Sequence, residues 1–148
     1  MERFVINGGE KLYGKVKIRS AKNSVLPLIA ASIMNEGTTY IRNCPKIRDV
    51  LTMAKIFGRL GGTYYFDEDT LVLNAENLRS FVLPEDLTGE IRASVFMTGA
   101  LISRFGLAEI IRPGGCNIGA RPIDIHIEAF KSLKIGVTEG ERITFDGT

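Results

Sequence analysis

Residues 50–60 read Val-Leu-Thr-Met-Ala-Lys-Ile-Phe-Gly-Arg-Leu, and residues 123–133 read Ile-Asp-Ile-His-Ile-Glu-Ala-Phe-Lys-Ser-Leu. In both stretches, apolar residues stand at the first, fifth, eighth and eleventh positions, which is the spacing of one buried helix face. The matched positions are all 73 residues apart. The two stretches therefore predict equivalent amphipathic helices in a repeated unit.

The repeat extends upstream of both helices. Lys22 to Val25 is matched by Arg92 to Val95 at an offset of 70 residues, and Gly37 returns as Gly106 at an offset of 69. The order of these matches and their near-constant offset indicate two copies of one unit of about 70 residues.

Each copy predicts the order helix, strand, helix, strand, strand. The first helices begin near Asn23-Ser24 or Ala93-Ser94, where small polar side chains can cap the backbone, and Pro27 falls in the first turn. Asp49 or Asp124, or a near neighbour, caps the second helices. The predicted strands are 38–41, 63–66 and 70–73 in the first copy, and 107–111, 137–139 and 143–145 in the second.

The glycines and the chain ends complete this organisation. Gly61-Gly62 and Gly136 are expected to end the second helices. Residues 4–6 and 16–18 flank Gly8-Gly9 like a hairpin or strand pair. The resulting division is 1–20 for the leading strands, 21–74 for the first repeat, 75–89 for a connection and 90–148 for the second repeat. This order predicts an α/β or α+β layer architecture.

Composition excludes several classes of protein. The chain has 148 residues, a net charge of +2 and 45% hydrophobic residues. This is typical of a globular protein and lacks the strongly basic charge of many nucleic-acid-binding proteins. Its apolar runs are too short to span a bilayer, and no signal-type run follows the N-terminus. Two cysteines do not form a disulfide framework, so we expect a soluble protein of a reducing, cytoplasmic compartment.

One loop differs between the copies. The offset between matched residues rises from 70 for Arg42 and Arg112 to 73 for Val50 and Ile123, so the second copy carries three more residues in this loop. Residues 112–122 read Arg-Pro-Gly-Gly-Cys-Asn-Ile-Gly-Ala-Arg-Pro. Glycines bring backbone N–H groups close to a ligand, and Arg121, Lys22 and Arg92 all stand at expected helix starts, where anions bind. A phosphate or carboxylate site is one interpretation; solvated cations and tight turns are the other.

The cysteines differ in their surroundings. Cys116, between glycines and near two arginines, has the setting of a nucleophile or proton donor, although a lone cysteine is more often a small buried residue. Cys44 lacks this setting and is interpreted as structural. His126 is interpreted as a packed or surface residue. The spacings match neither a zinc nor a calcium site, and we expect no metal and no cofactor.

The motifs around these candidates are specific to a known family. Ala21-Lys22-Asn23, Arg92-Ala93-Ser94 and above all residues 113–122 closely resemble the UDP-N-acetylglucosamine 1-carboxyvinyltransferases of the enolpyruvyl transferase family. The resemblance covers essentially the whole chain. It implies an inside-out α/β barrel of two domains built from six βαβαββ units, of which two are present here. It also implies that the leading strands belong to the other domain and that the chain is an N-terminal fragment.

The resemblance implies transfer of the enolpyruvyl group of phosphoenolpyruvate to the 3-hydroxyl of UDP-N-acetylglucosamine with release of phosphate, the first committed step of peptidoglycan synthesis. By resemblance, Cys116 is the proton donor and can form a covalent adduct. The residues implied for phosphoenolpyruvate are Lys22, Asn23 and Arg121. Those implied for UDP-N-acetylglucosamine are Arg92, Arg121, Pro122, Ile123, Asp124 and Ile125. The remainder of the enzyme would complete the site, so we expect no turnover by this chain alone.

Two alternatives stay open. The chain can be a non-catalytic module that binds a nucleotide sugar or another anion. It can also be part of an enzyme like 5-enolpyruvylshikimate-3-phosphate synthase, which shares the fold but lacks the cysteine loop. Ser20 is a local departure, because the family usually has glycine before Ala-Lys-Asn.

Overall fold

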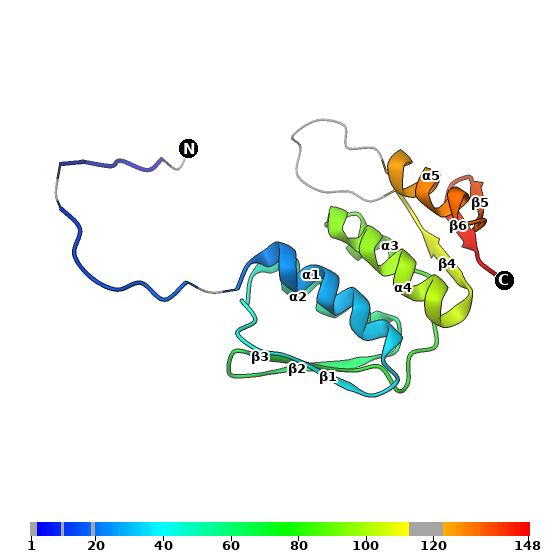
Figure 1. Cartoon of the computed structure of the whole chain (residues 1–148), viewed down its shortest axis with the longest axis horizontal. Coiled ribbons are helices and arrows are strands. Elements are labelled where there is room, and N and C mark those ends of the chain that lie inside the picture. Colours follow the sequence, from blue (N-terminus) through cyan, green and yellow to red (C-terminus); the bar gives the residue numbers. More distant parts are fainter. Residues whose placement is uncertain (1–2, 10, 19, 113–122) are drawn as a thin grey trace.

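The computed structural model describes residues 3–9, 11–18, 20–112 and 123–148, and Figure 1 shows their arrangement. The first unit contains α1 (Lys22–Ala31), the 3-10 helix η1 (Ser32–Met34), β1 (Thr38–Ile41), α2 (Arg48–Arg59), β2 (Thr63–Asp67) and β3 (Thr70–Asn74). The connection holds α3 (Glu85–Thr88). The second unit contains η2 (Arg92–Ser94), α4 (Val95–Phe105), β4 (Leu107–Ile110), α5 (Asp124–Ser132), β5 (Gly136–Glu139) and β6 (Ile143–Asp146).

The repeat is confirmed by the topology of the sheets. The first unit has the strand order β1-β3-β2 and the second has β4-β6-β5, so equivalent strands hold equivalent places. All four pairings are antiparallel. Each sheet lies against helices of its own unit, and α1 and α4 lie side by side between the units (Figure 1). The predicted mixed fold is thus an α+β arrangement of two units.

The two sheets differ at one edge. Val82 of the connection makes a parallel bridge with Glu109 of β4. The Leu83 N–H donates to the Glu109 carbonyl at 2.9 Å, and the Glu109 N–H donates to the Phe81 carbonyl at 3.0 Å. The connection therefore extends the second sheet, a role that the sequence did not predict. Among the described residues, no such segment lies beside β1.

The predicted buried face is confirmed in α2 and only partly in α5. Val50, Ala54, Phe57 and Leu60 are fully buried. In the second unit, Ile123 and Ile127 are buried and Phe130 is half-buried, with its ring edge-on to Phe145 at 5.0 Å. Leu133, however, is 70% exposed, so the prediction is wrong at that position.

The connection explains why Leu60 is buried and Leu133 is not. The N–H groups of Arg79 and Ser80 both donate to the Leu60 carbonyl at 3.1 Å, so the chain folds back over the end of α2. No described residue covers the end of α5 in this way. Burial of the last apolar position thus depends on the segment that follows each unit, which the helix pattern itself does not encode.

The helix starts lack the predicted side-chain caps. The N-cap residues of α1, α2, α4 and α5 make no side-chain capping hydrogen bond. Asp49 and Asp124 instead lie in the first turns, where a carboxylate interacts favourably with the helix dipole. Ser94, the N-cap residue of α4, makes no side-chain cap to the helix, and its hydroxyl donates instead to the Ile91 carbonyl at 2.7 Å.

Three further expectations are wrong. Pro27 is the sixth residue of α1, not a first-turn residue, and it lies on the exposed side, where its ring meets solvent. α5 ends at Ser132, and Lys134 adopts the left-handed conformation (φ 65°) after it; Gly136 instead begins β5. The described residues between 3 and 18 form neither helix nor strand, and this arm extends away from the body (Figure 1).

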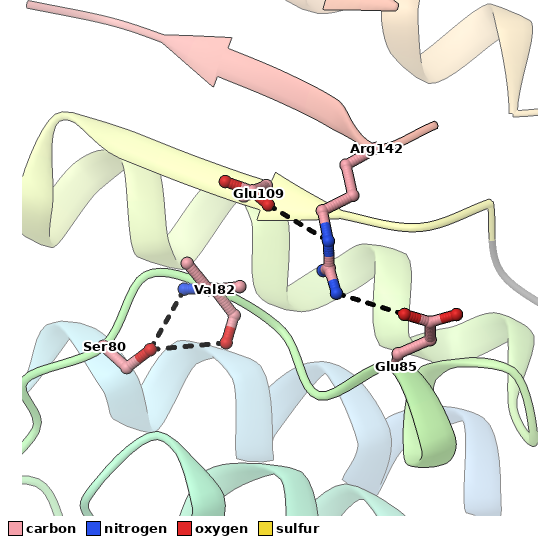
Figure 2. A network of polar contacts seen from close by, with 5 residues as sticks. All are labelled: Ser80, Val82, Glu85, Glu109 and Arg142. Atoms are coloured by element: carbon pink, nitrogen blue, oxygen red, sulfur yellow. Dashed lines mark hydrogen bonds and ion pairs between the residues drawn. The ribbon is translucent and has the colours of Figure 1, made fainter. Parts of the chain in front are cut away.

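Charged side chains hold the two units together. Arg142 of the second unit donates from Nη2 to Glu85 Oε2 of α3 at 3.1 Å, and its Nε lies 3.3 Å from Glu109 Oε1 (Figure 2). The Ser80 hydroxyl and the backbone of Val82 bond reciprocally beside it. Arg142 therefore ties the helix of the connection to the second unit, and the Ser80–Val82 bonds shape the connection locally.

A second link crosses between the units. Arg104 of α4 donates to the Ile33 carbonyl at 2.7 Å and to the Ala75 carbonyl at 2.8 Å. Both carbonyls belong to the first unit or its end, so one guanidinium joins the two units through backbone acceptors. Charge-assisted hydrogen bonds of this kind are the strong ones.

Candidate functional site

Lys22 and Asn23 occupy the first two positions of α1, as the sequence predicts for an anion site. Lys22 Nζ donates to Asp49 Oδ2, in the first turn of α2, at 2.7 Å. Since α1 packs against α2, the N-terminal ends of the two helices lie together. Their backbone N–H groups and partial positive charge favour a bound anion at this place.

The start of the second unit joins the same place. Arg48, next to Asp49, donates from Nη2 to Glu90 Oε2 at 3.5 Å. Glu90 stands two residues before Arg92, which opens η2 and is half-buried. The first turn of α2 thus contacts Lys22 through Asp49, and it contacts the segment that precedes Arg92 through Arg48.

The remaining candidates lie at the start of α5 or outside the described residues. Cys116, Arg121 and Pro122 belong to the latter group. Asp124 is exposed in the first turn of α5, and Ile125 is exposed beside it. The Ile123 side chain is buried in the core, and its carbonyl accepts the N–H groups of His126 and Ile127.

Sequence reasoning missed Arg48 and Glu90 and assigned Asp49 only a capping role. The signal was present in part, because Arg48 and Asp49 stand together where the second helix of the first unit begins. Their partners lie 42 and 27 residues away along the chain, so only the tertiary fold identifies them.

Cys44 and His126 are not part of this cluster. Burial raises the pKa of the Cys44 thiol to about 11, so the thiol stays protonated near neutral pH and is a poor nucleophile. This confirms its structural interpretation. His126 is half-buried on α5, and its Nδ1 has no partner among the described residues.

Three other possibilities, a site in a cavity, a metal site and a membrane span, find no support among the described residues. A cavity of about 810 Å³ lies beside Cys44, Lys46 and Asp69, but its lysines face carboxylates of equal number and part of its wall is the N-terminal arm. Within the described part of the chain, no group of three or more His, Cys, Asp or Glu side chains could hold a metal ion. Nor does any described helix have the length and apolar character needed to cross a membrane.

Comparison with known proteins assigns the family. The profile of the family described as EPSP synthase (3-phosphoshikimate 1-carboxyvinyltransferase) matches residues 6–144. The chain belongs to the EPSP synthase family. The predicted membership in the enolpyruvyl transferases is thereby confirmed.

Curated relatives within the EPSP synthase family carry a more specific name. A UDP-N-acetylglucosamine 1-carboxyvinyltransferase 2 from Caldanaerobacter subterraneus subsp. tengcongensis is 43% identical over 139 residues, covering 94% of this chain and 33% of that protein. A UDP-N-acetylglucosamine 1-carboxyvinyltransferase from Dichelobacter nodosus is 43% identical over 143 residues, covering 95% and 34%. The chain thus spans about a third of the length of these relatives.

A solved structure agrees with the fold of this EPSP synthase family chain. The enolpyruvyl transferase NikO from Streptomyces tendae superimposes with a TM-score of 0.77 at 24% identity, over 95% of this chain and 31% of that structure. The two-unit α+β arrangement is therefore that of an enolpyruvyl transferase.

Proposed function

We propose that this chain provides one face of the active site of a UDP-N-acetylglucosamine 1-carboxyvinyltransferase. The whole enzyme transfers the enolpyruvyl group of phosphoenolpyruvate to the 3-hydroxyl of the sugar nucleotide and releases phosphate. We place this reaction in the cytoplasm, as a step of peptidoglycan synthesis. The single observation that supports it most is the meeting of Lys22 and the 90–92 segment at the first turn of α2.

The chemistry of phosphoenolpyruvate fits this arrangement. The substrate is small and carries both a phosphate and a carboxylate, so it needs fixed cations and backbone donors. Lys22, Asn23 and the N-terminus of α1 would hold its anionic groups, together with Arg121 from the loop 112–122. These groups also stabilise the charge that moves when phosphate leaves.

Cys116 is the proposed proton donor. As the oxygen of the sugar 3-hydroxyl forms a bond to C2 of phosphoenolpyruvate, its proton passes to a base supplied by the remainder of the enzyme. The thiol proton passes to the methylene carbon and completes a methyl group. Elimination then breaks the bond between C2 and the phosphate oxygen, and a methyl proton returns to the thiolate, which restores the double bond and releases phosphate. Arginines near a thiol lower its pKa and assist this exchange of the proton.

Arg92 and the start of α5 are proposed to bind the sugar nucleotide. Arg92 stands at the start of the second unit and can pair with phosphate oxygens. Asp124 and Ile125, both exposed, would contact the uridine with Arg121 and Pro122. Because the Ile123 side chain is buried, Ile123 would contribute through its backbone.

3-Phosphoshikimate is a second candidate for the substrate that accepts the enolpyruvyl group. One observation favours it, because the matching family is described as 3-phosphoshikimate 1-carboxyvinyltransferase. The Gly-Gly-Cys loop and the names of the curated relatives favour the sugar nucleotide. Thermal unfolding with each acceptor separates these candidates, because a ligand that binds the folded state raises its melting temperature. UDP-N-acetylglucosamine is expected to raise it, and 3-phosphoshikimate to leave it unchanged.

Labelling with the epoxide fosfomycin, read by mass spectrometry, tests the role of Cys116. We expect one adduct, at Cys116, and slower labelling in Lys22→Ala, because fosfomycin is an anion that the same cations would hold. Cys44 is an internal control within the same chain, since its pKa of about 11 keeps it unreactive. Equal labelling of Cys116 and Cys44, or no effect of Lys22→Ala, contradicts the proposal.

A phosphate-release assay with both substrates tests whether this chain alone provides a complete active site. We expect no turnover by this chain, because it spans about a third of the curated relatives and would supply only part of the site. Sustained phosphate release by the purified chain would refute the expectation that the remainder of the enzyme is needed.

A further inference from the structure

The Lys22–Asp49 ion pair joins the two helix starts of the candidate site. The distance from Nζ to Oδ2 is 2.7 Å, and the side chains are 47% and 35% exposed. A carboxylate beside a cation that should bind an anion is unexpected on charge alone, because it repels the ligand. Its presence therefore needs a physical reason.

The reason lies in where Lys22 stands. It is the first residue of α1, and the partial positive charge of a helix N-terminus repels an ammonium group. Its side chain also has many rotamers, so without a partner it would move freely in solvent. Asp49 has the opposite properties. It lies in the first turn of α2, where the dipole favours a carboxylate, and its short side chain has few rotamers.

We propose that Asp49 is a positioning residue for the anion site, which holds the Lys22 ammonium at the N-terminus of α1. This inference rests on the proposed function and adds a residue to it. Asp49 Oδ2 takes one of the three N–H donors of the ammonium, which leaves two for the phosphate or carboxylate of the ligand. The Lys22 side chain is thus ordered before the ligand binds, so the free energy of binding does not include the entropic cost of ordering it.

The neighbouring residue gives the same turn a second contact. Arg48 reaches Glu90 at 3.5 Å, two residues before Arg92. The first turn of α2 therefore touches Lys22 on one side and the segment leading to Arg92 on the other. A residue in this turn is well placed to set the distance between the two ends of the proposed site.

A merely structural role is the competing explanation, since the pair also ties α1 to α2. An ion pair this exposed contributes little to stability, and if its role were merely structural, loss of Asp49 would leave the affinity for the ligand unchanged. Asp86→Asn is the matched control. It removes the exposed Arg59–Asp86 pair (3.3 Å), which also starts from α2 but at its other end.

The first measurement is the NMR signal of the Lys22 side-chain ammonium in the ligand-free chain. We expect a distinct, slowly exchanging ¹⁵Nζ signal in the wild type and in Asp86→Asn. Asp49→Ala is expected to merge it with the signals of solvated lysines, and Asp49→Asn, which keeps an acceptor, to retain part of it. An unchanged Lys22 signal in Asp49→Ala overturns the proposal.

The second measurement is the affinity for phosphoenolpyruvate. We expect Asp49→Ala to weaken binding about tenfold, the cost of ordering one long side chain at the moment of binding. In the Lys22→Ala background, Asp49→Ala should have no further effect, because Asp49 acts through Lys22. Additive effects, or tighter binding in Asp49→Ala, overturn the inference. Failure of the wild type to bind phosphoenolpyruvate would count against the proposed function, while the ammonium signal still decides whether Asp49 orders the Lys22 side chain.

Discussion

Cys44 shows how a single residue's surroundings decide its chemistry. It follows β1 in the first unit as Cys116 follows β4 in the second, yet its side chain is buried and its N–H donates to the Asp69 carbonyl at 2.6 Å. Desolvation disfavours the thiolate and raises the pKa of the Cys44 thiol to about 11. Burial thus gives Cys44 a structural role, in contrast to the role that we propose for Cys116.

The raised pKa predicts how stability changes in alkaline solution. The unfolded thiol, with a pKa of 9.0, loses its proton before the native thiol at about 11. Stability from the neutral buried thiol is therefore fully present below pH 9 and is lost as the pH rises toward 11. The destabilisation by Cys44→Ala, measured by urea unfolding, should be larger at pH 8 than at pH 10.5. The same difference at both pH values contradicts this prediction.

The sequence predicted the candidate residues better than their contacts. Lys22 and Arg92 were identified because the repeat places them at equivalent helix starts. The partner of Lys22 could not be identified in the same way, because the contact with Asp49 depends on how α1 packs against α2. Local patterns therefore indicate which side chains carry charge, and tertiary structure determines where that charge is held.

At the scale of elements, the short helix α3 is held from both sides. Arg59 of α2 contacts Asp86 at 3.3 Å, and Arg142 of the second unit contacts Glu85 at 3.1 Å (Figure 2). α3 has only one turn, so it has little stability of its own. Its place depends on these two arginines, one from each unit.

Arg142→Met should therefore loosen the connection. We expect a loss of about 1 kcal/mol in the free energy of unfolding, because the ion pairs are partly exposed and screened by solvent. Lys131→Met, which removes the longer Lys131–Glu139 pair (3.7 Å), is the matched control and should cost less than about 0.5 kcal/mol. The difference should shrink in about 1 M NaCl, where charges are strongly screened. If both variants lose the same free energy of unfolding at low salt, the proposed role of Arg142 in holding α3 is contradicted.

Strands were predicted more accurately than helix ends. The predicted strand 38–41 agrees with β1, and the others differ by one residue at an end, because each hairpin is local and its turn is marked in the sequence. The end of α5 was misplaced, because Lys134, not a glycine, adopts the left-handed conformation. α3 and the bridge at Val82 were missed, since both depend on contacts with distant residues.

At the scale of the whole molecule, one hydrophobic core continues through both units, and Arg104 crosses between them. Its two acceptors are the backbone carbonyls of Ile33 and Ala75. Cooperative unfolding of the two units should therefore depend on this guanidinium.

The chain offers a simple way to observe that dependence. Tyr40, Tyr64 and Tyr65 lie in the first unit, Tyr13 lies in the arm, and the second unit has no tyrosine or tryptophan. Tyrosine fluorescence thus reports on the first unit, while circular dichroism reports on both. Arg104→Met should lower the free energy of unfolding by about 2–3 kcal/mol. In urea, the transition seen by tyrosine fluorescence should then separate from that seen by circular dichroism.

Arg104→Lys is the control for charge, since lysine keeps the positive charge but lacks the planar fork that reaches two acceptors. We expect an intermediate loss with nearly coincident transitions. Coincident transitions in Arg104→Met would show that the apolar core alone couples the two units.

Each sheet contains strands of its own unit only, and this has a consequence for folding during synthesis. The sheet β1-β3-β2 is complete once residue 74 has been synthesised, before any strand of β4-β6-β5 exists. Because N-terminal regions generally fold first during synthesis, the first unit can form its hairpin while the second is still inside the ribosome. A gene segment encoding one such unit could also be copied in tandem without leaving an unpaired hairpin strand in either copy.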